Sequence, residues 1–161
     1  MTKFLLSVHV LAAIVAIGPV TVAASMFPAA VRRAVAESGT DRDVAVLRSL
    51  HRICRVYAAV GIVVPVFGLA TANSLGVLGD AWLITSIGLT SAAAGVLTLL
   101  VLPRQARMLA QVSDRAAGPS PAGPVDGRGP ARLAAYTGLF NMLWAVVTVL
   151  MIVRPGSTTG V

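Results

Sequence analysis

Four long uncharged stretches constrain this chain more than any other feature of its sequence. Each reaches the about 20 residues that an α-helix needs to cross the hydrocarbon core of a bilayer. Because lipid offers the backbone no hydrogen-bond partners, a helix is the expected structure of each stretch. The sequence therefore predicts an all-α, polytopic membrane protein, a bundle of four transmembrane helices. The uncharged stretches are 4–31, 56–79, 81–103 and 133–153, and the predicted spans are about 4–28, 56–76, 81–103 and 133–153.

The composition favours lipid over nucleic acid as the main partner. The 161 residues, enough for one domain (1–161), are 57% hydrophobic and only 12% charged. A soluble domain usually has about 25% charged residues. The net charge of +7 is of the kind seen in nucleic-acid-binding proteins. However, the basic residues are confined to segments between the apolar stretches, so we expect a lipid bilayer as the partner and no nucleic acid.

The positions of Lys and Arg predict how the bundle is oriented. Of the 13 basic residues, all but Lys3 and Arg154 lie in two segments, 32–55 and 104–132. Because basic segments stay on the cytoplasmic side, both segments should be cytoplasmic and both termini outside, in an up-down arrangement. A composition rich in Arg and Ala but almost without Lys is typical of a bacterial chain, so the predicted location is the bacterial inner membrane.

The two cytoplasmic segments are expected to differ. The first span should continue past Pro28 and stop near Gly39, a residue suited to a helix end. Thr40 and Asp43 form a capping-box pattern, which predicts that the second helix begins near Asp41, ahead of the membrane. The second segment contains the run GPSPAGPVDGRGP, so residues 113–131 are predicted to be a flexible linker.

Prolines and small residues mark two further features of the spans. Pro19 and Pro65 should bend their helices, since proline lacks the backbone donor. In the third span, small residues recur at four-residue spacing and permit close helix contact, either within the bundle or in a homodimer. These residues are Gly88, Ser91, Ala92 and Gly95.

His9 is the residue most able to carry chemistry, because an ionisable group at membrane depth is costly and usually faces the interior. Three roles remain open: a hydrogen bond to a neighbouring helix, a ligand for haem or another metal, or a proton relay. His51 should lie roughly 30 Å or more from His9 along the membrane normal, which excludes a bis-histidine site. Met151 lies at about the depth of His9 and is a candidate second ligand, on depth alone.

A second candidate site lies at the start of the second helix. Arg48, His51, Arg52 and Arg55 follow the spacing i, i+3, i+4 and i+7, so they should share one helix face at the cytoplasmic surface. The face can bind anionic lipid head groups. It can also bind an anionic ligand such as a phosphate or haem propionates, since Arg suits such groups.

The remaining polar residues indicate packing more than catalysis. Asn141 can hydrogen-bond across helices, and Thr71, Thr85 and Ser86 are expected to bond locally or between helices. No span contains an acidic or basic side chain, which weighs against an ion-coupled transporter working within one subunit. Cys54 is the only cysteine and is read as a small apolar filler.

Three stretches resemble small bacterial four-helix membrane proteins: LLSVHVLAAIVAIGP, HRICRVYAAVGIVVPVFGLA and VVTVLMIVRPG. The chain is similar to an uncharacterised family of predicted integral membrane proteins, and more distantly to copper-resistance D-type proteins and HemJ-type protoporphyrinogen oxidases. The resemblance implies haem or metal involvement through His9, and loosely through Arg52 or Arg55. Two features depart from the oxidase pattern: residues 10–15 contain no aromatic residue, and residues 81–103 contain no lysine.

These observations lead to one main hypothesis and two alternatives. The main hypothesis is an accessory or non-catalytic membrane protein, haem- or metal-linked through His9. The first alternative is an enzyme, a haem-dependent oxidoreductase of the protoporphyrinogen-oxidase type. The second is a small structural subunit of a larger respiratory or transport complex, joined through the small residues of the third span.

Overall fold

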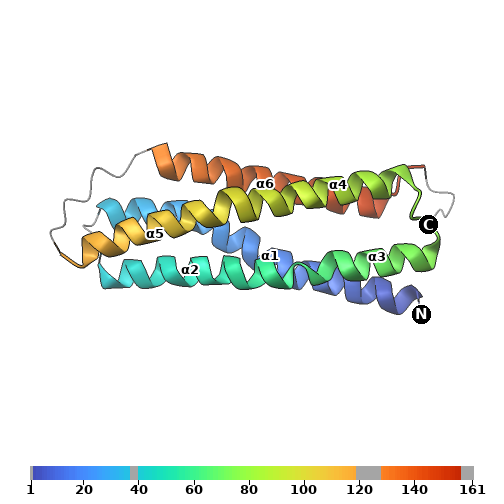
Figure 1. Cartoon of the computed structure of the whole chain (residues 1–161), viewed down its shortest axis with the longest axis horizontal. Coiled ribbons are helices and arrows are strands. Elements are labelled where there is room, and N and C mark those ends of the chain that lie inside the picture. Colours follow the sequence, from blue (N-terminus) through green and yellow to red (C-terminus); the bar gives the residue numbers. More distant parts are fainter. Residues whose placement is uncertain (1, 37–39, 119–127, 157–161) are drawn as a thin grey trace.

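The computed structural model describes residues 2–36, 40–118 and 128–156. Four helices in these ranges are long and apolar enough to cross a membrane, as predicted. They run up and down as an elongated bundle (Figure 1), and the described start of the first helix and end of the last lie at the same end. The protein is an all-α membrane protein with four spanning helices. Their bounds are Phe4–Ala36, Asp41–Leu75, Ala81–Ala116 and Arg128–Val153.

The first helix, α1 (Thr2–Ala36), continues through Pro19 and Pro28 to Ala36. Its predicted stop near Gly39 falls outside the described residues. The second helix begins where the capping box predicted, with α2 (Asp41–Val60). Thr40 Oγ1 accepts a hydrogen bond from the Asp43 backbone N–H at 3.3 Å, and the Asp43 carboxylate accepts one from the Thr40 N–H at 3.1 Å. This local pattern stabilises a helix start outside the apolar stretch.

Pro65 interrupts the second helix, in line with its predicted bend. Residues 61 and 62 form a turn between α2 and α3 (Val63–Leu75). Because Pro65 has no N–H, it cannot donate to the carbonyl of Gly61. That carbonyl instead accepts a bond from the N–H of Val64 at 3.3 Å, so the backbone remains hydrogen-bonded through the break.

The third helix contains α4 (Ala81–Gly95), a π-helical segment η1 (Val96–Val101) and α5 (Leu102–Ala116). Pro103 is the second residue after η1 and cannot donate to the carbonyl of Leu99. Its ring would also collide with that carbonyl in a regular α-helix. A wider π turn just before the proline relieves this conflict.

The fourth helix, α6, runs over Arg128–Val153. Both ends of the predicted linker 113–131 are helical, because α5 extends to Ala116 and α6 already includes Arg128. Pro130 is compatible with this early start, since the first turn of a helix does not need its N–H. Residues 119–127, the centre of the predicted linker, lie outside the described residues.

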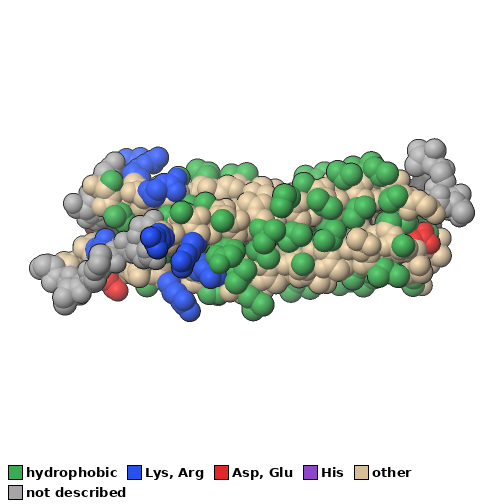
Figure 2. Space-filling model, turned by 90° about the horizontal axis from the view of Figure 1, so that it is seen from above, with side chains coloured by type: hydrophobic (Ala, Val, Ile, Leu, Met, Phe, Trp, Pro, Cys, Tyr) green, Lys and Arg blue, Asp and Glu red, His purple; other side chains and the backbone are tan. Residues whose placement is uncertain are grey.

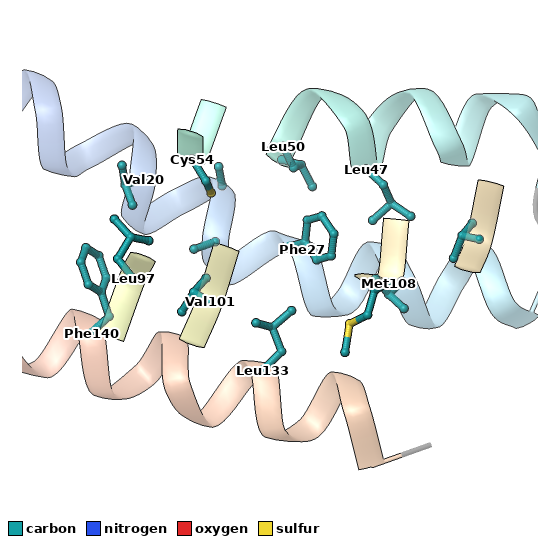
Figure 3. Close-up of a cluster of buried hydrophobic side chains, with 14 of the residues drawn as sticks. Val20, Phe27, Leu47, Leu50, Cys54, Leu97, Val101, Met108, Leu133 and Phe140 are labelled. Carbon is teal, nitrogen blue, oxygen red and sulfur yellow. The ribbon is translucent and has the colours of Figure 1, made fainter. Parts of the chain in front are cut away.

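The helices pack in a ring. α1 packs against α2, α3 and α6, while α5 packs against α2, and α4 and η1 pack against α6. The main core lies between these elements (Figure 3), where Phe27 of α1 sits among Leu47 and Leu50 of α2 and Leu133 of α6. A second cluster joins Ala72, Val77, Trp82, Leu83, Leu75 and Met151. It lies at the end where α1 begins and α6 ends, which we call the terminal end.

The surface of the bundle is basic near one end and apolar along its sides. On the face shown in Figure 2, Lys and Arg side chains gather near one end, and apolar side chains are spread over the remaining length. Large apolar side chains are exposed on every helix that crosses the membrane, for example Leu11 at 62%, Leu99 at 73% and Ile152 at 71%. Such exposure suits contact with lipid. We call the other end, where α1 and α5 end and α2 and α6 begin, the arginine-rich end.

The predicted orientation can be tested by thiol labelling, but Cys54 is unsuitable as a reporter because it is fully buried. In a Cys54→Ala background, a cysteine at the exposed Ser49 of the arginine-rich end should react with a membrane-impermeant maleimide only after the cells are permeabilised. A cysteine at Leu78, which is 46% exposed in the loop at the terminal end, should react in intact cells. The reverse pattern would show that the orientation is wrong.

Candidate functional site

His9 lies on α1 roughly 10 Å from the start of the helix at the terminal end, given the helical rise. Its side chain is only 8% exposed, and Nδ1 lies 3.0 Å from the carbonyl oxygen of Val64 on α3. A carbonyl can only accept, so Nδ1 carries the proton and donates it. In the neutral ring, Nε2 then holds the free lone pair. One of the predicted roles, a hydrogen bond to a neighbouring helix, is therefore present.

Gly68 makes room for the imidazole. It lies on α3 one turn beyond Val64, and a Cβ added at this glycine would stand 2.9 Å from His9 Cε1. Real Cβ atoms essentially never come so close to another heavy atom. The lack of a side chain at Gly68 thus lets α1 and α3 approach each other around the ring, as small residues do in membrane helix pairs.

Met151, the candidate second ligand, has a different environment. It packs against the cluster of Ala72, Val77, Trp82 and Leu83 at the terminal end. The described contacts of His9 are with Val64 and Gly68 on α3, and its pairing with Met151 stays a prediction. Among the described residues, no three His, Cys, Asp or Glu side chains gather in a way that could hold a metal ion.

The residues of the predicted basic face of α2 have two different environments. Arg48, Arg52 and Arg55 are exposed, whereas His51 is half-buried, with Nδ1 at 3.2 Å from Gln105 Oε1 on α5. The same amide donates from Nε2 to Cys54 Sγ at 3.5 Å. The three arginines can meet anionic groups at the membrane surface, while His51 joins α2 to α5.

Gln105 was missed by the sequence reasoning although it is fully buried. A sequence signal was available, because Gln105 falls at helical spacing with the apolar Val101, Met108 and Val112. In the structure all four are buried. A polar residue in such a stripe needs a partner on a facing helix. Gln105 finds two on α2, His51 and Cys54.

The polar residues of the other spans mostly bond locally or to one neighbour. Thr71, Thr85 and Ser86 donate to the carbonyl one turn earlier in their own helices, at 2.7 to 2.8 Å. Asn141 Nδ2 donates to Ser25 Oγ of α1 at 3.2 Å, which confirms the predicted bond across helices. Thr137 and Trp144 lie on the same face of α6 as Asn141. The sequence alone predicted no role for the polar atoms of these two residues.

The small residues of the third span face outward. Gly88, Ser91 and Ala92 of α4 are exposed, and a Cβ added at Gly88 or Gly95 would meet nothing within 4 Å. The bundle itself therefore gains no close helix contact from these two glycines.

Four spanning helices, an apolar lateral surface and a basic end define a multi-pass integral membrane protein. Comparison with known families agrees: the chain belongs to the family described as "Predicted integral membrane protein (DUF2269)", whose model matches residues 3–155. Neither a curated protein nor a solved structure matches the chain. The match supports the predicted likeness to an uncharacterised family, while the likeness to copper-resistance D-type and HemJ-type proteins stays a prediction.

The close approach at Gly68 gives a direct test of the α1–α3 contact. Gly68→Ala should destabilise the protein by about 1–3 kcal/mol, the usual cost of overpacking, because the new methyl group displaces the His9 ring. Gly138→Ala on α6 is the matched control, since its methyl group meets nothing within 4 Å. Both variants gain similar helix propensity, so a difference between their melting temperatures in detergent should report the contact alone. Equal melting temperatures would contradict the contact.

Proposed function

We propose that this protein is an accessory, non-catalytic protein of the bacterial inner membrane, in which His9 is a ligand for haem iron or another metal. The observation that carries the proposal is the hydrogen bond from His9 Nδ1 to the Val64 carbonyl. Metal-binding histidines nearly always donate their second ring N–H to such an acceptor, which fixes the tautomer and the orientation of the ring. The bond leaves Nε2 as the nitrogen with a lone pair, the form that ligation requires.

The residues fit a single axial ligand better than a complete metal site. His9 contributes one imidazole, and in the described part of the chain no three His, Cys, Asp or Glu side chains gather to hold a metal ion. Haem needs only one protein ligand, whereas a metal ion bound directly by side chains usually needs three or four. Haem is therefore the group that His9 suits best, and it would supply one-electron transfer when bound.

In this proposal the basic face of α2 binds the membrane surface and does not contribute to the haem site. Arg48, Arg52 and Arg55 are exposed on α2 at the arginine-rich end. Each can contribute about 1 kcal/mol to binding of anionic lipid when it lies near the membrane surface. We assign them to anionic head groups of the bilayer, because His9 lies near the opposite end of the bundle.

Absorption spectroscopy tests the haem assignment. The purified protein supplied with haem should show a Soret band, and His9→Ala should lose it, while His51→Ala should keep it. The His51 variant is a suitable control because it removes the other histidine of the chain. Absence of a Soret band together with a blank metal analysis of the wild-type protein would overturn the proposal. A band that persists in His9→Ala would show that another residue binds the haem.

A second candidate function is supported by the outward-facing small residues of α4. In lipid, small residues on a helix surface let another helix approach closely, which is how many membrane helices associate. Gly88, Ser91 and Ala92 are exposed in one chain, so a second copy can pack against them. This favours a role as a structural subunit that assembles through α4.

Disulfide crosslinking tests this contact. In a Cys54→Ala background, Ser91→Cys should form crosslinked dimers in native membranes on mild oxidation. Met142→Cys is the control, because Met142 is 61% exposed on α6 and both positions lie about ten residues from the terminal end of their helices. Equal crosslinking at the two positions would argue against a specific contact through α4.

A further inference from the structure

Three polar atoms on one face of α6 lack hydrogen-bond partners. They are Thr137 Oγ1, Asn141 Oδ1 and Trp144 Nε1, and all three are buried. In the described part of the chain, no other buried side-chain nitrogen or oxygen lacks a partner. The residues follow the spacing i, i+4 and i+7, so they form a single stripe, which we call the α6 polar stripe.

Thr137 shows that this stripe differs from the other polar positions. Its side chain is only 2% exposed, and its hydroxyl makes no bond to the carbonyl one turn earlier. Thr148, further along the same helix, makes that bond to Trp144 at 2.9 Å. Unpaired buried polar groups are rare and costly, above all in lipid. A buried hydroxyl that does not bond to the carbonyl one turn earlier therefore indicates that another group is its hydrogen-bond partner.

Two residues of the stripe have described neighbours, because Asn141 bonds to α1 and Trp144 packs against the main core. α6 packs against α1, α4 and η1, the π-helical segment of the third helix. Phe140, on the same part of α6, belongs to the core and meets the Trp144 ring edge-on at a centroid distance of 6.3 Å. Asn141 uses its amide nitrogen on Ser25 of α1, which leaves the carbonyl oxygen as the unpaired atom. π-helical turns in longer helices often accompany functional sites, because they interrupt the regular backbone.

The unpaired atoms specify the chemistry of a ligand. The Trp144 N–H can only donate, the Asn141 oxygen can only accept, and the Thr137 hydroxyl can do both. A hydroxyl group satisfies this set, since it accepts from Trp144 while donating to Asn141. A carbonyl or an ester cannot, because neither has a proton to donate to Asn141.

We propose that the α6 polar stripe is an intramembrane binding site for a hydroxyl group, brought by a lipid-soluble alcohol or by a water molecule. The described conformation covers all three atoms. This site is independent of His9, which contacts α3.

The indole N–H of Trp144 reports directly on the site. In protein labelled with [15N]tryptophan and carrying Trp82→Phe, Trp144 gives the single indole resonance, since the chain has two tryptophans. Titration with 1,2-dioleoylglycerol should move the indole proton downfield until it saturates. The 3-acetyl derivative of the same lipid, which has no hydroxyl, should cause no such shift. Asn141→Leu and Thr137→Val should each weaken the response several-fold.

The indole resonance of Trp144 also tests whether the bound hydroxyl group belongs to a water molecule. If the alcohol causes no shift but the indole proton shows cross-relaxation with a bound water, and Asn141→Leu abolishes it, water is the source of the hydroxyl. Thr137→Val, which keeps the shape of the side chain, serves if Asn141→Leu does not fold. A resonance that responds to neither alcohol nor water in the parent protein would overturn the site.

Discussion

Every part of this structure depends on one constraint: a polypeptide in lipid must satisfy its backbone hydrogen bonds from within. Regular helices do this over most of the chain. Within the described spanning helices, α1 continues through its prolines, whereas the backbone departs from the regular α-helix beside Pro65 and Pro103, where a donor is also missing. At Pro65 the carbonyl of Gly61 takes a bond from Val64, and before Pro103 the helix widens into η1. The irregular segments are thus local repairs of the same hydrogen-bond network.

The most unusual polar contact lies close to the break at Pro65. The carbonyl of Val64 lies next to the break, and a carbonyl has two lone pairs. His9 donates to this oxygen from α1, across a contact that Gly68 makes close enough. The break in the second helix, the glycine one turn later and the buried histidine therefore form a single unit. A larger residue at position 68 would displace the ring from this place.

The sequence predicted what depends on local patterns. The four spans follow from uncharged length, and the start of α2 from the Thr40–Asp43 capping box, whose bonds involve residues three apart. Contacts between helices were harder to predict from the sequence. The sequence gives the depth of a residue along the membrane normal, but it does not give the rotation of each helix about its axis. The pairing of His9 with Met151, which rests on depth alone, stays a prediction for this reason. Gln105 was missed because its role depends on which helix it faces.

In a bilayer, the hydrogen-bonding state of a polar residue says more about its role than its presence does. Gln105 is buried with both ends of its amide engaged, so it is accounted for as a link between α2 and α5. His9 has one nitrogen engaged and fixed, which leaves the other free for a ligand. The α6 polar stripe has three atoms with no partner at all. Since unpaired buried groups oppose folding, a stripe that retains them needs a compensating interaction that the isolated chain does not supply.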